Sequence, residues 1–185
     1  MRMHKGLNQK GVTLVEIILV IAIIGILAST SVMLIGHLRY ADTEKAVKAV
    51  DSSLDKLQVQ TMSKADTPYL YIYHLSDGCY LKIMNDDVTS FDSSKFDKKG
   101  VKLSNNRVDI YDIYKSTEST ESKESKESES RTKVDGDNFI KVVYKKSAAF
   151  DTDTGKTNVT NIVIDGVGTY TVRLIGETGK HFIVK

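Results

Sequence analysis

The side chains that could support catalysis or bind a metal are few and scattered along this sequence. Cys79 is the only cysteine, which excludes an intramolecular disulfide and any site built from several cysteines. We expect it to be a small buried residue in a strand. No two histidines have the spacing of paired metal ligands; they are His4, His37, His74 and His181. No nucleophile, base and orienting group can be assembled, and no glycine-rich phosphate loop occurs. We therefore predict a protein that is not an enzyme and uses no cofactor.

Oxygen donors gather in one segment, "DTDTGKTN", residues 151–158. Asp151 and Asp153 are the candidate calcium ligands there. The segment lacks the full spacing of an EF-hand loop and its terminal bidentate glutamate. Calcium binding is therefore retained only as a candidate property of these two aspartates, and no other metal site is predicted.

A single carboxylate, Glu16, interrupts an otherwise apolar stretch, "QKGVTLVEIILVIAIIGILAS", residues 9–29. Residues 17–36 carry no charge, and twenty helical residues span about 30 Å, the thickness of the hydrocarbon core of a bilayer. We expect a membrane span. The residues before it are basic without an acid among them (Arg2, Lys5 and Lys10). The positive-inside tendency then keeps the N-terminus in the cytoplasm and places the chain after about His37 outside.

A cleaved secretory signal is the rival interpretation of this start. Its apolar run would be unusually long, and only "ASTS" at 28–31 resembles a small-residue cleavage site. The chain also continues without glycine or proline from Arg39 to Lys64, where apolar residues recur at three- and four-residue steps: Tyr40, Val47, Val50, Leu54 and Leu57. That periodicity predicts an amphipathic helix, so the simplest interpretation is one helix of about fifty residues ending at 66–68.

Glu16 has two ordinary explanations. Its charge favours the positive end of the helix dipole, and its side chain could reach back to the lipid headgroups. A third explanation comes from its neighbours. "KGVTLVE" followed by "IILVIAIIGILAS" resembles the class III signal of type IV prepilins and pseudopilins, over roughly residues 5–30.

The resemblance implies a set of processing and assembly residues. A membrane peptidase would cut after Gly11 and methylate the new N-terminus at Val12, with Thr13 and Leu14 completing the motif. In filaments of this family the glutamate, here Glu16, pairs with the N-terminal amine of a neighbouring subunit. Two departures are present: Val12 stands where an aromatic residue or Met is commonest, and the usual helix-kinking proline is absent.

The resemblance also implies partners and a location. The partners are prepilin peptidase, the pilus assembly platform, other pilin subunits and the membrane. The chain would lie in the cytoplasmic membrane before assembly and on the cell surface afterwards, as part of a filament. The sequence does not distinguish whether that filament serves adhesion, motility, secretion or DNA uptake (competence). Nucleic acid binding has no support, because the net charge is +2 with both signs interspersed. The alternative is a singly anchored surface binding or adhesion domain that does not polymerise.

The remaining sequence changes to an alternating, strand-like period from Tyr69. We predict a hairpin at 69–75 and 79–85, further strands at 107–114 and 138–144, and a final meander at 158–165, 169–175 and 181–184. Residues 116–131, "STESTESKESKESESR", have no apolar side chain and are predicted to form a surface loop or insertion. Three alternating tyrosines at 69–73 could face the core or form an outward stripe, with packing against the neighbouring strand as the preferred interpretation.

These patterns predict an α+β fold of the type IV pilin kind, with a long N-terminal helix whose second half packs on an antiparallel sheet. The expected organisation is a leader at 1–11, a transmembrane and assembly helix at 12–36, and an extracytoplasmic headgroup at 37–185. Within that headgroup, 37–65 is the amphipathic helix and 69–185 the sheet region with the 116–131 loop.

Overall fold

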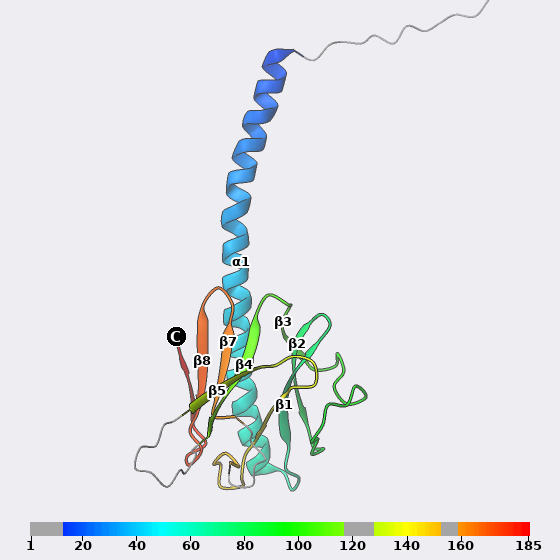
Figure 1. Cartoon of the computed structure of the whole chain (residues 1–185), viewed down its shortest axis with the longest axis vertical. Helices are drawn as coiled ribbons and strands as arrows, with labels where there is room; N and C mark the ends of the chain where they lie inside the picture. Colours follow the sequence, from blue (N-terminus) through cyan, green and yellow to red (C-terminus); the bar gives the residue numbers. More distant parts are fainter. Residues whose placement is uncertain (1–12, 117–127, 153–158) are drawn as a thin grey trace, which may run out of the picture. The chain divides into compact units, whose positions relative to one another are not determined.

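The computed structural model describes residues 13–116, 128–152 and 159–185. By internal contacts the chain divides into two units, Met1–Leu38 and Arg39–Lys185. One helix is followed by nine strands along the described chain (Figure 1): α1 (Leu14–Ser63), β1 (Tyr69–Leu75), β2 (Gly78–Met84), β3 (Val101–Ser104), β4 (Asp109–Ser116), β5 (Ser128–Lys133), β6 (Ile140–Val143), β7 (Asn161–Asp165), β8 (Thr169–Leu174) and β9 (His181–Val184). The predicted α+β class is confirmed.

The strands of the second unit form two antiparallel sheets where the sequence predicted one. The first has the order β3-β2-β1-β6 and the second β5-β4-β7-β8-β9. β1 and β2 form the predicted hairpin, in which Leu75 pairs with Gly78 across a two-residue turn. Gly78 has a φ of +136°, and a Cβ built there would lie 2.0 Å from the carbonyl oxygen of Ser104. Only glycine fits this position, both for its backbone and for the approach of the neighbouring chain.

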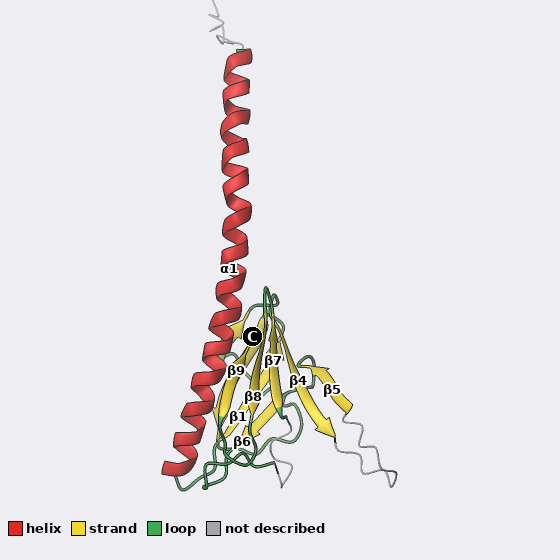
Figure 2. Ribbon diagram, turned by 90° about the vertical axis from the view of Figure 1, so that its left-hand side faces the viewer, coloured by secondary structure: helices red, strands yellow, loops and turns green. Residues whose placement is uncertain are grey.

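The core of the second unit lies between α1 and both sheets (Figure 2). One face of the helix is buried, with its members three or four residues apart: Thr43, Ala46, Val47, Val50, Leu54, Leu57 and Thr61. The apolar members pack in one cluster with inward residues of both sheets, such as Leu70 of β1 and Ile162 of β7. Most of the predicted apolar stripe is therefore confirmed. Tyr40 is the exception: it is 39% exposed, and its hydroxyl accepts a hydrogen bond from Tyr170 at 3.0 Å.

The alternating side chains of β1 are buried on both faces, so the outward tyrosine stripe considered from the sequence is wrong. Leu70 and Ile72 face the helix. Tyr71 and Tyr73 have no exposed surface and pack in a second cluster with Phe96, which belongs to the segment between β2 and β3. The packing between neighbouring strands that we preferred does occur, since the rings of Tyr73 and Tyr80 stack with their centroids 6.1 Å apart.

Two strands were not predicted. β3 lies beside β2, and β5 lies beside β4, where it uses the last residues of the serine-rich run that we expected to be a loop. β5 has no apolar side chain, and its strand pairing comes from the backbone, from Tyr111↔Lys133 to Ser116↔Ser128. Arg131 adds a contact over the ring of Tyr111 at 3.8 Å. The rest of the run, residues 117–127, lies outside the described residues.

Candidate functional site

Helix α1 begins directly after the predicted processing position, and Thr13 caps it. The backbone N–H of Glu16 donates to the Thr13 hydroxyl at 3.3 Å and to the Thr13 carbonyl at 3.1 Å. The spacing Thr-x-x-Glu is that of a capping box, in which the threonine accepts from the third helical N–H. Glu16 lies in the first turn, where a negative charge favours the positive end of the helix dipole. Gly11 and Val12 lie outside the described residues.

The helix that follows is apolar around its whole circumference and exposed. Every residue from 13 to 29 is exposed, with Leu14 at 75%, Val15 at 71% and Ile18 at 59%. An apolar surface of this extent marks contact with a membrane or another protein. Glu16 is the only charged residue in this span, and its carboxylate makes no hydrogen bond or ion pair with any other residue that the structure describes.

No helix among the residues described here combines the length and the apolar composition needed to cross a lipid bilayer.

Comparison with known protein families identifies this region. Residues 6–32 match the family described as the prokaryotic N-terminal methylation motif. The chain carries the class III signal of type IV pilins and pseudopilins. This class III signal is typical of structural precursors rather than enzymes, and it implies processing by prepilin peptidase and assembly with other pilins. No curated protein and no solved structure is significantly similar to the chain.

The candidate calcium ligands are only partly described. Asp151 is 8% exposed, and its Oδ1 is buried without a hydrogen-bond partner among the described residues. Asp153 lies outside them, so calcium binding at this pair stays a prediction. Cys79 is buried as expected, and that burial raises the pKa of its thiol to about 11, which keeps it protonated and unreactive at neutral pH.

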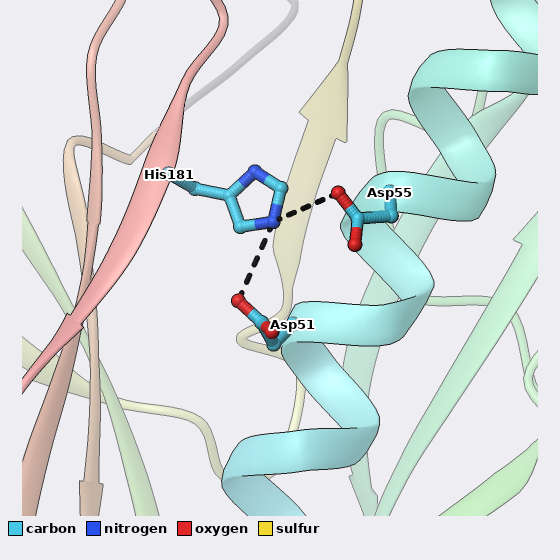
Figure 3. A group of neighbouring side chains, drawn as sticks. All are labelled: Asp51, Asp55 and His181. Atoms are coloured by element: carbon cyan, nitrogen blue, oxygen red, sulfur yellow. Dashed lines mark ion pairs between the residues drawn. The ribbon is translucent and has the colours of Figure 1, made fainter.

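Two features escaped the sequence analysis. The Thr13 cap was readable in "TLVE", because threonine followed three residues later by glutamate before an apolar run is a helix-start signature. The second feature is a cluster of Asp51 and Asp55 from α1 with His181 from β9 (Figure 3). The one-turn spacing of the two aspartates was visible, but only the tertiary fold brings His181 to them.

Proposed function

We propose that this chain is a structural subunit of a type IV pilus or pseudopilus, cleaved by prepilin peptidase and assembled through its apolar N-terminal helix. The methylation motif at 6–32 is the observation that carries the proposal. The capped, exposed, apolar helix that begins at Leu14 supports it. In this account residues 1–11 are a leader, 12–36 anchor the precursor in the membrane and later build the filament core, and 37–185 face the outside.

Cleavage by the peptidase creates a positive charge, the α-amine of Val12, that can pair with the carboxylate of Glu16. Hydrolysis of the Gly11–Val12 peptide bond leaves a carboxylate on Gly11 and a free amine on Val12. An α-amino group has an ordinary pKa of about 7.7 to 8.0, so this amine is largely positive at neutral pH and methylation keeps it basic. Glycine suits the scissile position because its backbone extends into a protease cleft without a side chain in the way.

In the proposed filament, Glu16 then sets the axial offset (the register) between neighbouring subunits. A lone carboxylate among apolar helices is expensive, and an opposite charge at contact distance offsets much of that cost. Within a stack of identical helices, only the correct axial offset brings the Val12 amine of one subunit to Glu16 of its neighbour. Removing one partner of such a buried pair costs about 3–5 kcal/mol, enough to prevent stable assembly.

Co-expression with a prepilin peptidase tests the processing step. The precursor should lose residues 1–11 and gain a methyl group on Val12, measured by mass spectrometry of the intact chain. Gly11→Val should block this, because a branched side chain at the scissile residue obstructs the cleft. Cleavage elsewhere, or an unchanged precursor with an active peptidase, would refute the proposal.

The assembly step is tested by Glu16→Gln. The Thr13 hydroxyl caps the helix through the backbone N–H of residue 16, which this variant keeps. Glutamine also has nearly the same shape as glutamate but no charge, so the variant separates helix capping from ion pairing. We expect normal cleavage and at least a tenfold loss of the subunit from sheared filaments, in line with a cost of about 3–5 kcal/mol. Glu44→Gln is the matched control, since Glu44 forms an exposed pair with Lys48 on the same helix. If the Glu16 variant enters filaments as the control does, the register role is wrong.

A further inference from the structure

The side chains of Asp51, Asp55 and His181 converge on one small space in the second unit (Figure 3). Asp51 and Asp55 are one turn apart on α1, which places both carboxylates on the same face. His181 is the first residue of β9. Its Nε2 lies 3.4 Å from Asp51 Oδ1 and 3.5 Å from Asp55 Oδ1. One candidate ligand atom from each residue lies within 4.8 Å of the other two.

His181 is held in place by its surroundings. Only 7% of its side-chain surface is exposed, and its other ring nitrogen, Nδ1, lies 3.4 Å from the hydroxyl of Tyr144. Histidines that bind metals commonly have such a partner on the second nitrogen, which fixes the ring and directs the first nitrogen at the ion. The buried ring of His181 therefore presents Nε2 to the two carboxylates.

Contacts in the turn before β9 fix the position of His181. Gly179 has a φ of +66°, and a Cβ there would lie 1.7 Å from the carbonyl oxygen of Ala148. Gln58 of α1 donates from Nε2 to that same carbonyl at 3.1 Å and to the carbonyl of Gly179 at 3.4 Å. These contacts fix the backbone that leads into His181. The resulting cavity has a volume of about 330 Å³ and is also lined by Lys180, which is exposed.

The distances from His181 Nε2 to the two aspartate oxygens match the separation of ligand atoms around a small cation. A salt bridge with good geometry brings nitrogen and oxygen to about 2.7–2.9 Å, which neither pair reaches. Zinc bonds of about 2.0–2.2 Å at a tetrahedral angle place two ligand atoms about 3.4 Å apart. Two carboxylates one turn apart also repel each other, so a positive charge between them is favourable.

We propose that Asp51, Asp55 and His181 form a binding site for a divalent transition-metal ion, with Zn²⁺ as its representative, which fastens β9 to α1. One imidazole and two carboxylates are suitable ligands for Zn²⁺ and leave a fourth position for water. Ca²⁺ prefers six to eight oxygen ligands, so the imidazole disfavours it. Among the strands that the structure describes, β9 is the outer one of its sheet and pairs with β8 alone, and the metal attaches it to α1 as well.

The test uses the full chain, purified in detergent without a histidine tag and stripped of metal by a chelator. Calorimetric titration with Zn²⁺ should show one site per chain, and an excess of Ca²⁺ or Mg²⁺ should not displace the bound Zn²⁺. Asp55→Asn should weaken Zn²⁺ binding at least tenfold. Asp55 is the most exposed of the three, with 69% of its side-chain surface accessible, so this variant keeps its fold even if His181→Gln does not. His74→Gln is the control and should bind as the unaltered chain does.

A second measurement, amide hydrogen exchange, shows whether bound Zn²⁺ stabilises β9. Amide hydrogen exchange over residues 181–184 should slow when Zn²⁺ is added to the unaltered chain and should not change in Asp55→Asn. Tyr144→Phe removes the partner of Nδ1 and should weaken binding about 10- to 100-fold, as loss of an outer hydrogen bond does at other metal sites. The proposal is overturned if Zn²⁺ gives no binding heat, if Ca²⁺ displaces the bound Zn²⁺ at comparable concentrations, or if Asp55→Asn binds Zn²⁺ as tightly as the control.

Discussion

Asp77 shows how one side chain fixes several parts of the second unit. It occupies the turn between β1 and β2, where the Tyr80 hydroxyl donates to its Oδ2 at 2.8 Å. Lys102 of β3 reaches the same oxygen at 3.0 Å, and Lys98 reaches Oδ1 at 3.1 Å. The hydrogen bond from Tyr80, followed by the two lysines, holds the pKa of Asp77 well below its usual range. The ionised carboxylate therefore ties the hairpin to the segment leading into β3.

The sign of this shift predicts a pH dependence. Because the folded pKa is depressed, the stabilisation is present above the unfolded pKa of about 3.9 and declines as the pH falls through it toward the folded value. Asp77→Asn should lower the free energy of unfolding at pH 7, and its deficit relative to the unaltered chain should shrink at pH 3. Urea unfolding followed by circular dichroism measures both.

Asp66→Asn is the control for that experiment, since Asp66 is exposed just after α1. It should differ little from the unaltered chain at either pH. A deficit for Asp77→Asn that is as large at pH 3 as at pH 7 would show that the charge of the carboxylate is not the stabilising feature.

Residues that act locally were predictable, and those that act through the tertiary fold were not. Glu16 was singled out because a charge within an apolar run is conspicuous in the sequence. His181 was passed over because its partners, Asp51 and Asp55, lie far away in the chain and on another element. No spacing rule connects a strand residue to a helix face, so only packing could show that contact.

At the scale of elements, the segment between β2 and β3 serves as a cover for the outer face of the first sheet. Phe96 is 1% exposed and lies within ring contact of Tyr71, Tyr73, Phe91 and Phe139. The tyrosine hydroxyls are also satisfied there, since Tyr73 donates to the carbonyl of Asp97 at 2.6 Å and Tyr71 accepts from the N–H of Val88 at 2.8 Å. This burial raises the pKa of both tyrosines to about 12.

Phe96→Ala should destabilise the second unit by about 3–5 kcal/mol, because it removes a large buried side chain and leaves a cavity among aromatic rings. Phe182→Ala is the matched control: Phe182 is 40% exposed, and its loss should cost about 1 kcal/mol or less. Urea unfolding of the two variants measures the difference. Equal losses would mean that the segment does not act as a cover.

Elements with strong periodicity were predicted well, and weakly patterned ones were missed. Strands β1, β7, β8 and β9 appear at or within a few residues of their predicted bounds, because alternation and glycine turns define them. β3 has only four residues, and β5 is entirely polar. β5 is an outer strand held by backbone pairing and by pairs such as Lys133–Asp109 at 2.9 Å. Burial of apolar side chains contributes little to the stability of β5, so its sequence needs no apolar residues and looks like that of a solvated loop.

At the scale of the whole molecule, the two units have opposite surface chemistry. The described residues from 39 to 185 bury most of their large apolar side chains in two clusters, whereas those from 13 to 29 leave theirs exposed. The exposed apolar side chains of the first unit require an apolar environment rather than water. In the function that we propose, lipid provides this environment in the precursor and neighbouring subunits provide it in the filament.

The central claim is that the chain is processed at Gly11 and incorporated into a filament. Mass spectrometry of filaments sheared from its native cells tests this most directly. We predict a chain that begins at methylated Val12, present in the filament fraction. A chain that still contains residues 1–11 and is found only in the membrane fraction of cells with active filaments would contradict the account.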